Sequence, residues 1–512
     1  MALKIIMLVV FFGSMIGIGL YCRKNATDVQ GFVLGGRAVG PWLTAFAYGT
    51  SYFSAVVFIG YAGQFGWKYG IAATWIGLGN AFIGSMLAWI VLGRRTRIMS
   101  QHLQSATMPE FFGKRFDSNA LKVLSSAIIF IFLIPYTASL YNGLSRLFSM
   151  AFNMDYTVCI LLMAILTGIY VIAGGYMATA INDFVQGIIM LVGIVAVVLA
   201  VLKTNGGFTD AMNGLSQVTD AAYPDLQGAF ASFFGPDPVN LLGVVILTSL
   251  GTWGLPQMVQ KFYAIKDESS IKKGTIISTL FALIIAGGSY FLGGFSRLYT
   301  GKVDVAANGY DSIIPTMLSE LSPLLIAIVV VLVLSASMST LSSLVIASSS
   351  TLTLDFLKDT IVKKMSEKQQ LLIMRILIAV FIAISALIAI LQYKSSVTFI
   401  AQLMGISWGA LAGAFLAPFL YSLYGKWVTK ASVYVCSLFS VALMVANMVI
   451  PQAFPALLRS PLNAGSFAML AGLVIVPAVS LFTKKQDPDR IREIFSCYDS
   501  TVEVSVKQAL SK

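Results

Sequence analysis

Long apolar stretches recur along the whole chain, and they limit the possible fold more than any other feature. The first covers residues 5–22, and others of similar length follow as far as residue 483. A helix that crosses a lipid bilayer needs about 20 mostly apolar residues. Only 11% of the 512 residues are charged, against roughly 25% in soluble proteins. The sequence therefore predicts an all-α polytopic membrane protein with about 13 transmembrane helices.

The basic residues are unevenly distributed around these stretches. If the N-terminus is outside, 26 of the 34 Lys and Arg residues fall on the cytoplasmic side, in loops such as 94–122 and 261–273 and in the tail after residue 483. Short loops rich in Lys and Arg stay in the cytoplasm. We therefore predict a multi-pass protein of the plasma membrane with a cytoplasmic C-terminus. The net charge of +12 is interpreted as an orientation signal and not as a nucleic-acid surface.

Two of the predicted spans are interrupted near the middle of the membrane. The span at about 42–65 contains small and hydroxylated residues flanked by glycines, and the span at about 240–258 contains Gly254-Leu255-Pro256. Proline removes a backbone donor, and a broken helix exposes carbonyl groups that can line a cavity. Two such breaks at corresponding positions indicate inverted repeats with a binding site at the midplane. The alternative is close helix packing on small residues.

Hydroxyl side chains gather inside another long apolar span, at about 323–354. Ser339 and Thr340 follow Ala336 by three and four residues, so on a helix both hydroxyls lie near the Ala336 carbonyl. Neutral oxygen atoms arranged in this way suit a small dehydrated cation, and a hydroxyl-rich helix contact is the alternative. Packing is the role that we expect for the other hydroxyls of the span, Ser342, Ser343 and residues 348–350.

One carboxylate, Asp183, is expected inside the membrane, within a predicted span at about 178–202. Ionisable residues inside spans usually belong to ion or proton pathways. A carboxylate near a helix start is also stabilised by the helix dipole, so a capping role at the cytoplasmic end is the alternative.

Several kinds of chemistry have no signature in the sequence. It contains no G-x-x-x-x-G-K-[ST] loop for nucleotides, no H-E-x-x-H and no G-x-S-x-G. The four cysteines form no C-x-x-C pair, and the single histidine, His102, falls in a predicted loop. We therefore expect no enzyme activity, and transport that draws on an ion gradient or on none.

Three motifs occur in order along the chain. They are Leu34-Gly35-Gly36-Arg37-Ala38-Val39-Gly40-Pro41, Gly174-Gly175 with Asp183 and Gln186 downstream, and Met338-Ser339-Thr340-Leu341-Ser342. Together they resemble the sodium/solute symporter family, which includes sodium/proline, pantothenate and sodium/glucose transporters. The resemblance extends from about residue 5 to about residue 485. It implies one transporter domain, 1–512, with a LeuT-type core of five plus five inverted helices.

The resemblance also implies how that domain is divided. The expected parts are a leading helix (5–22), a first inverted repeat (42–203), a second inverted repeat (240–424), two further helices (432–483) and a cytoplasmic tail (484–512).

Binding residues follow from the family motifs, matched position by position. The implied sodium ligands are the carbonyl oxygens of Thr50, Phe53 and Ala336 and the hydroxyl oxygens of Ser339 and Thr340. Some members hold an additional sodium at the aspartate that corresponds to Asp183, which makes this residue a candidate for a second ion site. Solute contacts are expected from the aromatic side chains of Tyr52, Trp253 and Trp408.

The expected function is sodium-coupled import of a small organic solute by alternating access, with sodium as the coupling ion. Proline transporters of the family have an aspartate where this chain has Tyr52, and aromatic residues where it has Thr248 and Thr252. The solute is therefore expected to be an amino acid, a pantothenate-like compound or a monocarboxylate. Two alternatives remain: a proton-coupled symporter of the same fold in which Asp183 titrates, and a passive channel or non-transporting membrane sensor.

Overall fold

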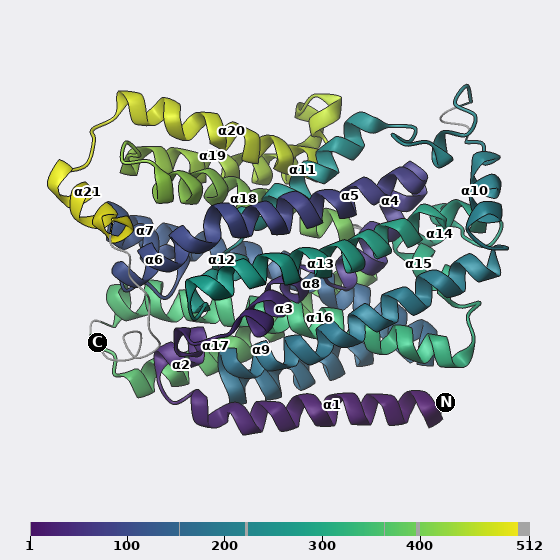
Figure 1. The fold of residues 1–512 in the computed structure, drawn as a ribbon, viewed down its shortest axis with the longest axis horizontal. Coiled ribbons are helices and arrows are strands. Elements are labelled where there is room, and N and C mark those ends of the chain that lie inside the picture. Colours follow the sequence, from purple (N-terminus) through teal and green to yellow (C-terminus); the bar gives the residue numbers. More distant parts are fainter. Residues whose placement is uncertain (1, 153, 221–223, 363, 396–399, 500–512) are drawn as a thin grey trace.

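The structure is a computed structural model that describes residues 2–152, 154–220, 224–362, 364–395 and 400–499. Long helices run roughly parallel to one another and form an elongated bundle (Figure 1). Within the described residues, β-structure is limited to a single bridge between Val39 and Ile265. The expected all-α polytopic fold is confirmed.

Most of the bundle consists of long, nearly continuous helices. They are α1 (Ala2–Cys22), α8 (Asn119–Phe152), α9 (Tyr156–Thr204), α13 (Glu268–Gly294), α16 (Pro323–Thr351), α17 (Glu367–Ser395), α18 (Ile400–Tyr424), α19 (Lys430–Val449) and α20 (Pro461–Phe482). A further segment runs from α5 (Thr74–Gly79) through two π-helical stretches, Asn80–Leu87 and Trp89–Gly93, into α6 (Arg94–His102).

Both predicted interruptions are present. α3 (Pro41–Tyr52) ends before Phe53, which is extended (φ −97°, ψ 105°), and the chain continues as a π-helical turn and α4 (Ala62–Tyr69). α11 (Pro238–Gly254) and α12 (Pro256–Ala264) meet at a bend of 46°. The bend follows from sequence, because the proline at the start of α12 excludes a helical conformation at the preceding Leu255 (φ −79°, ψ 124°).

The number of spans is not settled by length and hydropathy. Within the described residues, ten helical segments pass that test, or eleven if the bent pair α11–α12 counts as one span. Two of the ten, Val56–His102 and Tyr156–Thr204, have 47 and 49 residues, more than twice the roughly 20 that a bilayer needs. Each contains a glycine with positive φ, Gly70 (62°) and Gly175 (57°), where the chain departs from helical geometry. The count of about 13 and the division into inverted repeats stay predictions.

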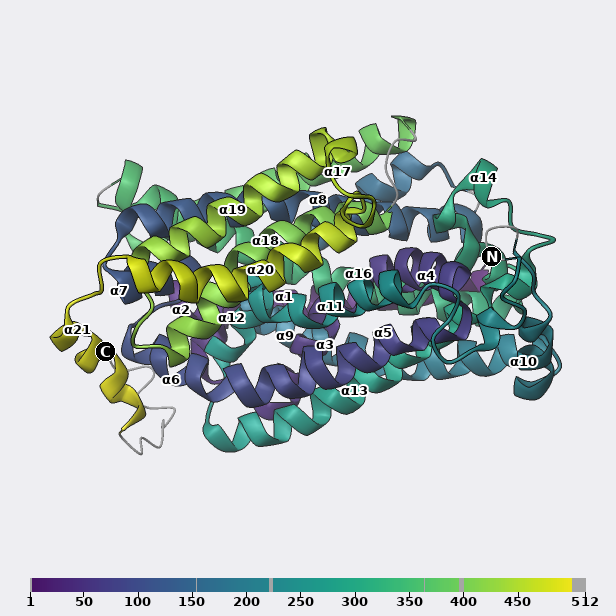
Figure 2. The ribbon, with the colours of Figure 1, turned by 90° about the horizontal axis from the view of Figure 1, so that it is seen from above.

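The basic segments gather at one end of the bundle. The helices α2 (Val29–Leu34), α6, α7 (Met108–Phe116) and α21 (Pro488–Phe495) lie there, whereas α10 (Phe208–Ser216), α14 (Val305–Asn308) and α15 (Ile313–Leu318) lie at the other end (Figures 1 and 2). This clustering agrees with a common membrane face for the basic loops. We call the two ends the basic end and the opposite end.

Several cations at the basic end are buried and hold the loops together. The Arg37 guanidinium donates to the carbonyl oxygens of Ser105 (2.5 Å) and Tyr263 (3.2 Å) and to the Ser100 hydroxyl (3.1 Å). Burial lowers the pKa of Arg37 to about 10, so it remains charged at neutral pH. Lys261 was predicted to lie in the basic loop 261–273. It lies instead in α12, with only 1% of its surface exposed, because this helix continues past residue 258, the predicted end of the span.

Glycines allow α4 and α13 to touch backbone to backbone. A Cβ atom at Gly293 would lie 2.0 Å from the carbonyl oxygen of Ala62, and one at Gly66 would lie 1.9 Å from the carbonyl oxygen of Gly293. Small residues are what lets membrane helices approach this closely. The contact holds the half of the first interrupted helix that follows the break against α13.

We expect Gly293→Ala to lower the Tm of the purified protein by several degrees, because overpacking costs roughly 1–3 kcal/mol. Gly287→Ala is the matched control on the same helix, since no atom lies within 4 Å of the added methyl group. Thermal unfolding in detergent measures both variants. Equal Tm values for the two would contradict the close α4–α13 contact.

Candidate functional site

Four oxygen atoms from two helices meet beside the break in the first interrupted helix. The Ser339 hydroxyl lies 3.2 Å from the Thr50 carbonyl oxygen and 3.1 Å from the Ala336 carbonyl oxygen. The Thr340 hydroxyl lies 3.0 Å and 3.1 Å from the same two atoms. None of the four residues is more than 1% exposed. The structure thus brings together four of the five predicted sodium ligands, and we call them the oxygen cluster.

Local structure explains why these atoms are available. The last carbonyl groups of any helix lack partners in that helix, and Thr50 lies in the last turn of α3. In α16, hydroxyls three and four residues after Ala336 bond back to its carbonyl, as Ser and Thr do inside helices. The break in α3 therefore supplies one carbonyl, and the helical spacing of α16 supplies the other three oxygen atoms.

Phe53, the fifth predicted ligand, lies next to the cluster. It occupies the extended break after α3 and, with Ala336, lines a small internal cavity of about 10 Å³. Its role as a ligand stays a prediction.

The oxygen cluster has the chemistry of a site for a monovalent hard cation. A hydroxyl has one proton and two lone pairs, so Ser339 and Thr340 can each donate to a carbonyl and coordinate an ion. Hard cations that take oxygen ligands at roughly 2.3–2.6 Å hold neighbouring ligands about 3.3–3.7 Å apart at right angles. The cluster would need to widen by only a few tenths of an ångström. Within the described residues, no group of three or more His, Cys, Asp or Glu side chains could hold a metal ion.

Aromatic side chains surround the same break. Tyr52 faces Trp408 of α18 with ring centroids 6.2 Å apart, and Tyr136 of α8 meets the same indole edge to face at 5.9 Å. The Tyr136 hydroxyl also lies next to Ser54, just past the break. The side chain of Asn80, from the π-helical stretch Asn80–Leu87, lies next to the hydroxyl group of Tyr52.

Several polar side chains in this region lie beside one another without a hydrogen bond of normal geometry: Tyr136 beside Ser54 and Trp408, and Asn80 beside Tyr52 and Tyr290. Among the described residues, no hydrogen bond of normal geometry satisfies six buried atoms: Tyr52 Oη, Ser54 Oγ, Asn80 Nδ2, Tyr136 Oη, Tyr290 Oη and Trp408 Nε1. An unsatisfied buried donor or acceptor costs roughly 1–3 kcal/mol. Six of them around one helix break make this break the candidate site for a polar ligand. We call this set the polar ring.

Trp253 has a different role from Tyr52 and Trp408. Its indole Nε1 donates to the Ile83 carbonyl oxygen at 3.0 Å, and the neighbouring Thr252 hydroxyl donates to the Gly84 carbonyl oxygen at 2.9 Å. These bonds fasten α11 to the π-helical stretch Asn80–Leu87. The structure therefore brings two of the three predicted solute contacts together and uses the third as an anchor.

Four members of the polar ring, Ser54, Asn80, Tyr136 and Tyr290, were missed by sequence reasoning. Asn80, Tyr136 and Tyr290 lie on three separate spans and belong to none of the family motifs. A lone asparagine in an apolar span was the one available signal, because intramembrane polar residues are costly.

Asp183 lies inside α9 and is 0% exposed, which excludes the solvent-facing capping role. The Lys261 ammonium is 3.9 Å from its Oδ2 atom. Lys261 also donates to the Ser343 hydroxyl at 2.9 Å, and Ser343 lies 2.7 Å from the Ser51 hydroxyl. Ser343 does contact neighbouring helices, as its expected packing role implies, and its hydroxyl joins a polar chain between three helices.

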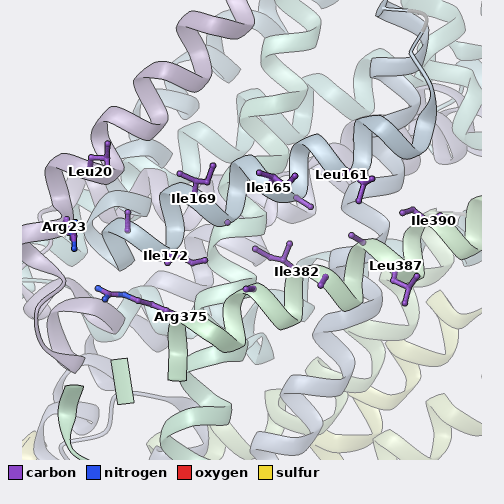
Figure 3. A pocket seen from close by; sticks show the side chains of 16 residues that line it. Leu20, Arg23, Leu161, Ile165, Ile169, Ile172, Arg375, Ile382, Leu387 and Ile390 are labelled. Carbon is purple, nitrogen blue, oxygen red and sulfur yellow. The ribbon is translucent and has the colours of Figure 1, made fainter. Parts of the chain in front are cut away.

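Two larger hollows lie away from these residues. A groove of about 760 Å³ runs along the surface between α1, α9 and α17 (Figure 3). A cavity of about 460 Å³ includes the Arg297–Asp220 ion pair, Lys68 and Asn463. Neither contains a member of the oxygen cluster or of the polar ring.

Comparison with known proteins identifies the family. A model of the sodium:solute symporter family matches residues 32–438. The chain belongs to the sodium:solute symporter family. This symporter is 31% identical to the osmoregulated proline transporter of Bacillus subtilis (strain 168), over 82% of the chain and 84% of that relative. It is 30% identical to the sodium/proline symporter of Staphylococcus aureus (strain JH9), over 83% of the chain and 82% of that relative.

The fold of this symporter is shared with a solved transporter. A Na⁺-coupled sialic acid symporter in a substrate-bound, outward-open state matches with a TM-score of 0.73 at 16% identity, over 94% of this chain and 98% of that one. The likeness supports the LeuT-type fold. Family membership establishes a transporter and not an enzyme, with sodium as the coupling ion.

We expect Ser339→Ala and Thr340→Ala each to raise the sodium concentration needed for half-maximal thermal stabilisation by about tenfold or more. The reason is that a lost bond to a charged group costs roughly 1.5–3 kcal/mol. Bound ligand raises Tm, so a sodium titration of Tm, with choline as the replacement cation, measures the effect without a known solute.

Ser349→Ala is the matched control for this titration. Among the described residues its hydroxyl bonds within α16 alone, to the Ile346 carbonyl oxygen at 3.3 Å, so the sodium dependence of this variant should equal that of the wild type. A wild-type titration for both Ser339→Ala and Thr340→Ala would contradict the sodium site.

Proposed function

We propose that the protein imports a small carboxylate-bearing solute across the plasma membrane together with sodium, by alternating access. The observation that carries this proposal is the juxtaposition of the oxygen cluster and the polar ring at one helix break. Thr50 contributes to the first and Tyr52 to the second, two residues apart on α3. An ion and a solute bound there would share the same segment of chain.

The donors of the polar ring favour a carboxylate. Trp408 Nε1 and Asn80 Nδ2 can only donate hydrogen bonds, and the other four atoms are hydroxyl oxygens that can donate as well. The ring contains no charged side chain, so a bound anion would depend on the nearby sodium ion for charge compensation. This dependence would make solute binding require sodium.

The relatives narrow the choice of solute only in part. Those reported above are named as proline transporters, and proline carries a carboxylate. It also carries an amine that needs an acceptor, and Tyr52 stands where the family's proline transporters have an aspartate. We therefore propose a monocarboxylate or a pantothenate-like compound, in preference to proline, as the transported solute.

Sodium would act by favouring one arrangement of the helices. The oxygen cluster exists only while the end of α3 lies against α16, so an ion bound there stabilises that arrangement by its differential affinity. We propose that this arrangement opens outward, with the N-terminus outside and the basic end in the cytoplasm. Solute binding to the polar ring would then permit the change to an inward-open state.

A thermal-shift panel tests the proposal. Purified protein is titrated with short monocarboxylates, pantothenate and proline, each in sodium and in choline buffer. We expect one of these solutes to raise Tm in sodium and not in choline, because ligands that bind the native state stabilise it. That solute should accumulate in proteoliposomes above its equilibrium level under an inward sodium gradient.

The stabilising solute then tests the polar ring. Tyr136→Phe should raise the solute concentration for half-maximal stabilisation by about tenfold, the value of one good hydrogen bond. Tyr421→Phe is the control, because its hydroxyl bonds to the Leu473 carbonyl oxygen, away from the ring.

The alternatives predict other outcomes. A proton-coupled symporter would accumulate solute under a pH gradient in sodium-free buffer, and Asp183→Asn would abolish that uptake. A passive channel or a membrane sensor would not accumulate solute above equilibrium under any gradient.

A further inference from the structure

A buried ion pair lies about one helical turn from the oxygen cluster along α16. Lys261 and Asp183 are 1% and 0% exposed. Their separation of 3.9 Å, from Nζ to Oδ2, is too long for a hydrogen bond. Within the described part of the chain, neither Asp183 oxygen has a hydrogen-bond partner. The ammonium is therefore the positive charge that compensates this carboxylate.

A chain of hydroxyl groups fixes the position of the ammonium. The Ser51 hydroxyl donates to the Ala47 carbonyl oxygen at 2.5 Å, so the proton between the two serines comes from Ser343. Ser343 is then free to accept from Lys261 at 2.9 Å. On another side, the face of the Tyr176 ring lies 4.9 Å from the same nitrogen. A carboxylate, a hydroxyl oxygen and a ring face thus surround one positive centre.

We infer that the Lys261 ammonium is a built-in cation that occupies the place of a second sodium ion at Asp183. This limits coupling to one sodium ion per solute, at the oxygen cluster. The inference rests on the proposed sodium-coupled function. It assigns Lys261 a role in ion stoichiometry, although it touches neither the oxygen cluster nor the polar ring.

Electrostatics makes Lys261 and a second sodium mutually exclusive. The ammonium is 3.9 Å from the Asp183 carboxylate, so a sodium ion on that carboxylate would lie close to the ammonium. At a separation of about 4 Å and an effective dielectric constant of about 20, the repulsion weakens binding by about a thousandfold. The ammonium therefore disfavours a second sodium ion at Asp183.

The ammonium also joins the two interrupted helices. Lys261 belongs to α12, while its hydroxyl partner Ser343 on α16 contacts Ser51 on α3. A fixed cation at this point connects both breaks to α16 without an ion from solution. Its removal should therefore create a need for such an ion.

Flux ratios in proteoliposomes test the inference. Radioactive sodium and labelled solute are measured for the wild type, Lys261→Met, the double variant Lys261→Met/Asp183→Asn, and Lys266→Met as the control at an exposed lysine nearby. We expect one sodium per solute for the wild type and for Lys266→Met. The Lys261→Met variant should take up two sodium ions per solute, with a steeper sodium dependence of uptake, because the unpaired Asp183 carboxylate then binds a sodium ion. The double variant should return to one.

The outcomes separate this inference from the proposed function. No sodium-driven uptake by the wild type would overturn both. Sodium-driven uptake with two sodium ions per solute in the wild type would overturn this inference alone. An active Lys261→Met variant that still takes up one sodium ion per solute would do the same. If Lys261→Met unfolds in choline, recovery of its Tm in sodium beyond the wild-type shift supports the inference, and a failure to recover overturns it.

A second, independent observation concerns the surface groove between α1, α9 and α17 (Figure 3). Its walls are apolar along most of the length and include Ile165, Ile169 and Ile382. Two cations, Arg23 and Arg375, lie together at one end of it (Figure 3). A groove of about 760 Å³ with this polarity matches a lipid in shape and in charge.

Both guanidinium groups have free donors. Arg375 donates to the Ala26 carbonyl oxygen at 3.4 Å, a long bond, and its buried Nε has no partner among the described residues. Within the same part of the chain, no carboxylate forms an ion pair with Arg23 or with Arg375. Guanidinium groups bind phosphate through paired hydrogen bonds.

We propose that this groove binds an anionic phospholipid, with an acyl chain along α9 and the phosphate between Arg23 and Arg375. Arg23 directly follows α1 and lies shortly before α2 of the basic end, and Arg375 bonds to Ala26 in the same connection. The negative headgroup distinguishes this occupant from the bulk lipid that covers any apolar surface.

Native mass spectrometry tests the lipid site. Protein in nanodiscs of mixed phosphatidylglycerol and phosphatidylcholine is released, and the retained lipid is identified. We expect the wild type to retain phosphatidylglycerol, and Arg23→Gln/Arg375→Gln to lose that preference at least about tenfold, as two charge-assisted bonds imply. Lys24→Gln is the control, because its ammonium lies over the Tyr21 ring at 4.1 Å and does not line the groove. Equal retention of both lipids by the wild type, or unchanged retention by the double variant, would overturn the proposal.

Discussion

A polar group buried in a membrane must find a partner inside the protein, and the break after Tyr52 creates several that need one. The Thr50 carbonyl meets the hydroxyls of Ser339 and Thr340 on α16. This contact ties a segment near the start of the chain to one almost 290 residues later. Tyr52 and Ser54 of the polar ring, and Ser51 and Ser343 of the Lys261 chain, lie within a few residues of this contact.

The interrupted helices provide the chemistry, and the continuous helices hold it in place. α3 and α11 end in the interior, where their last carbonyl groups and nearby side chains become available. α16 and α9 remain helical past these breaks and present Ser343 and Asp183 to them. A transporter can use such an arrangement because an ion that bridges a broken and an unbroken helix favours one of their relative positions.

Charge is handled differently at the two polar sites. The oxygen cluster contains only neutral oxygen atoms, so the cation that we propose for it must come from solution. Asp183 carries a charge of its own and is matched by Lys261 from the same chain. Buried charges are stable only when they are paired, and the second site therefore has its partner built in.

The sequence by itself determined the features that depend on local chemistry. Apolar length predicted the helical membrane fold, Pro256 predicted the bend before α12, and helical spacing placed Ser339 and Thr340 beside the Ala336 carbonyl. The tertiary structure decided which distant groups share a site. Asn80, Tyr136 and Tyr290 form no motif, and Lys261 reads as part of a basic loop, because burial depends on what packs around a residue and not on its neighbours in sequence.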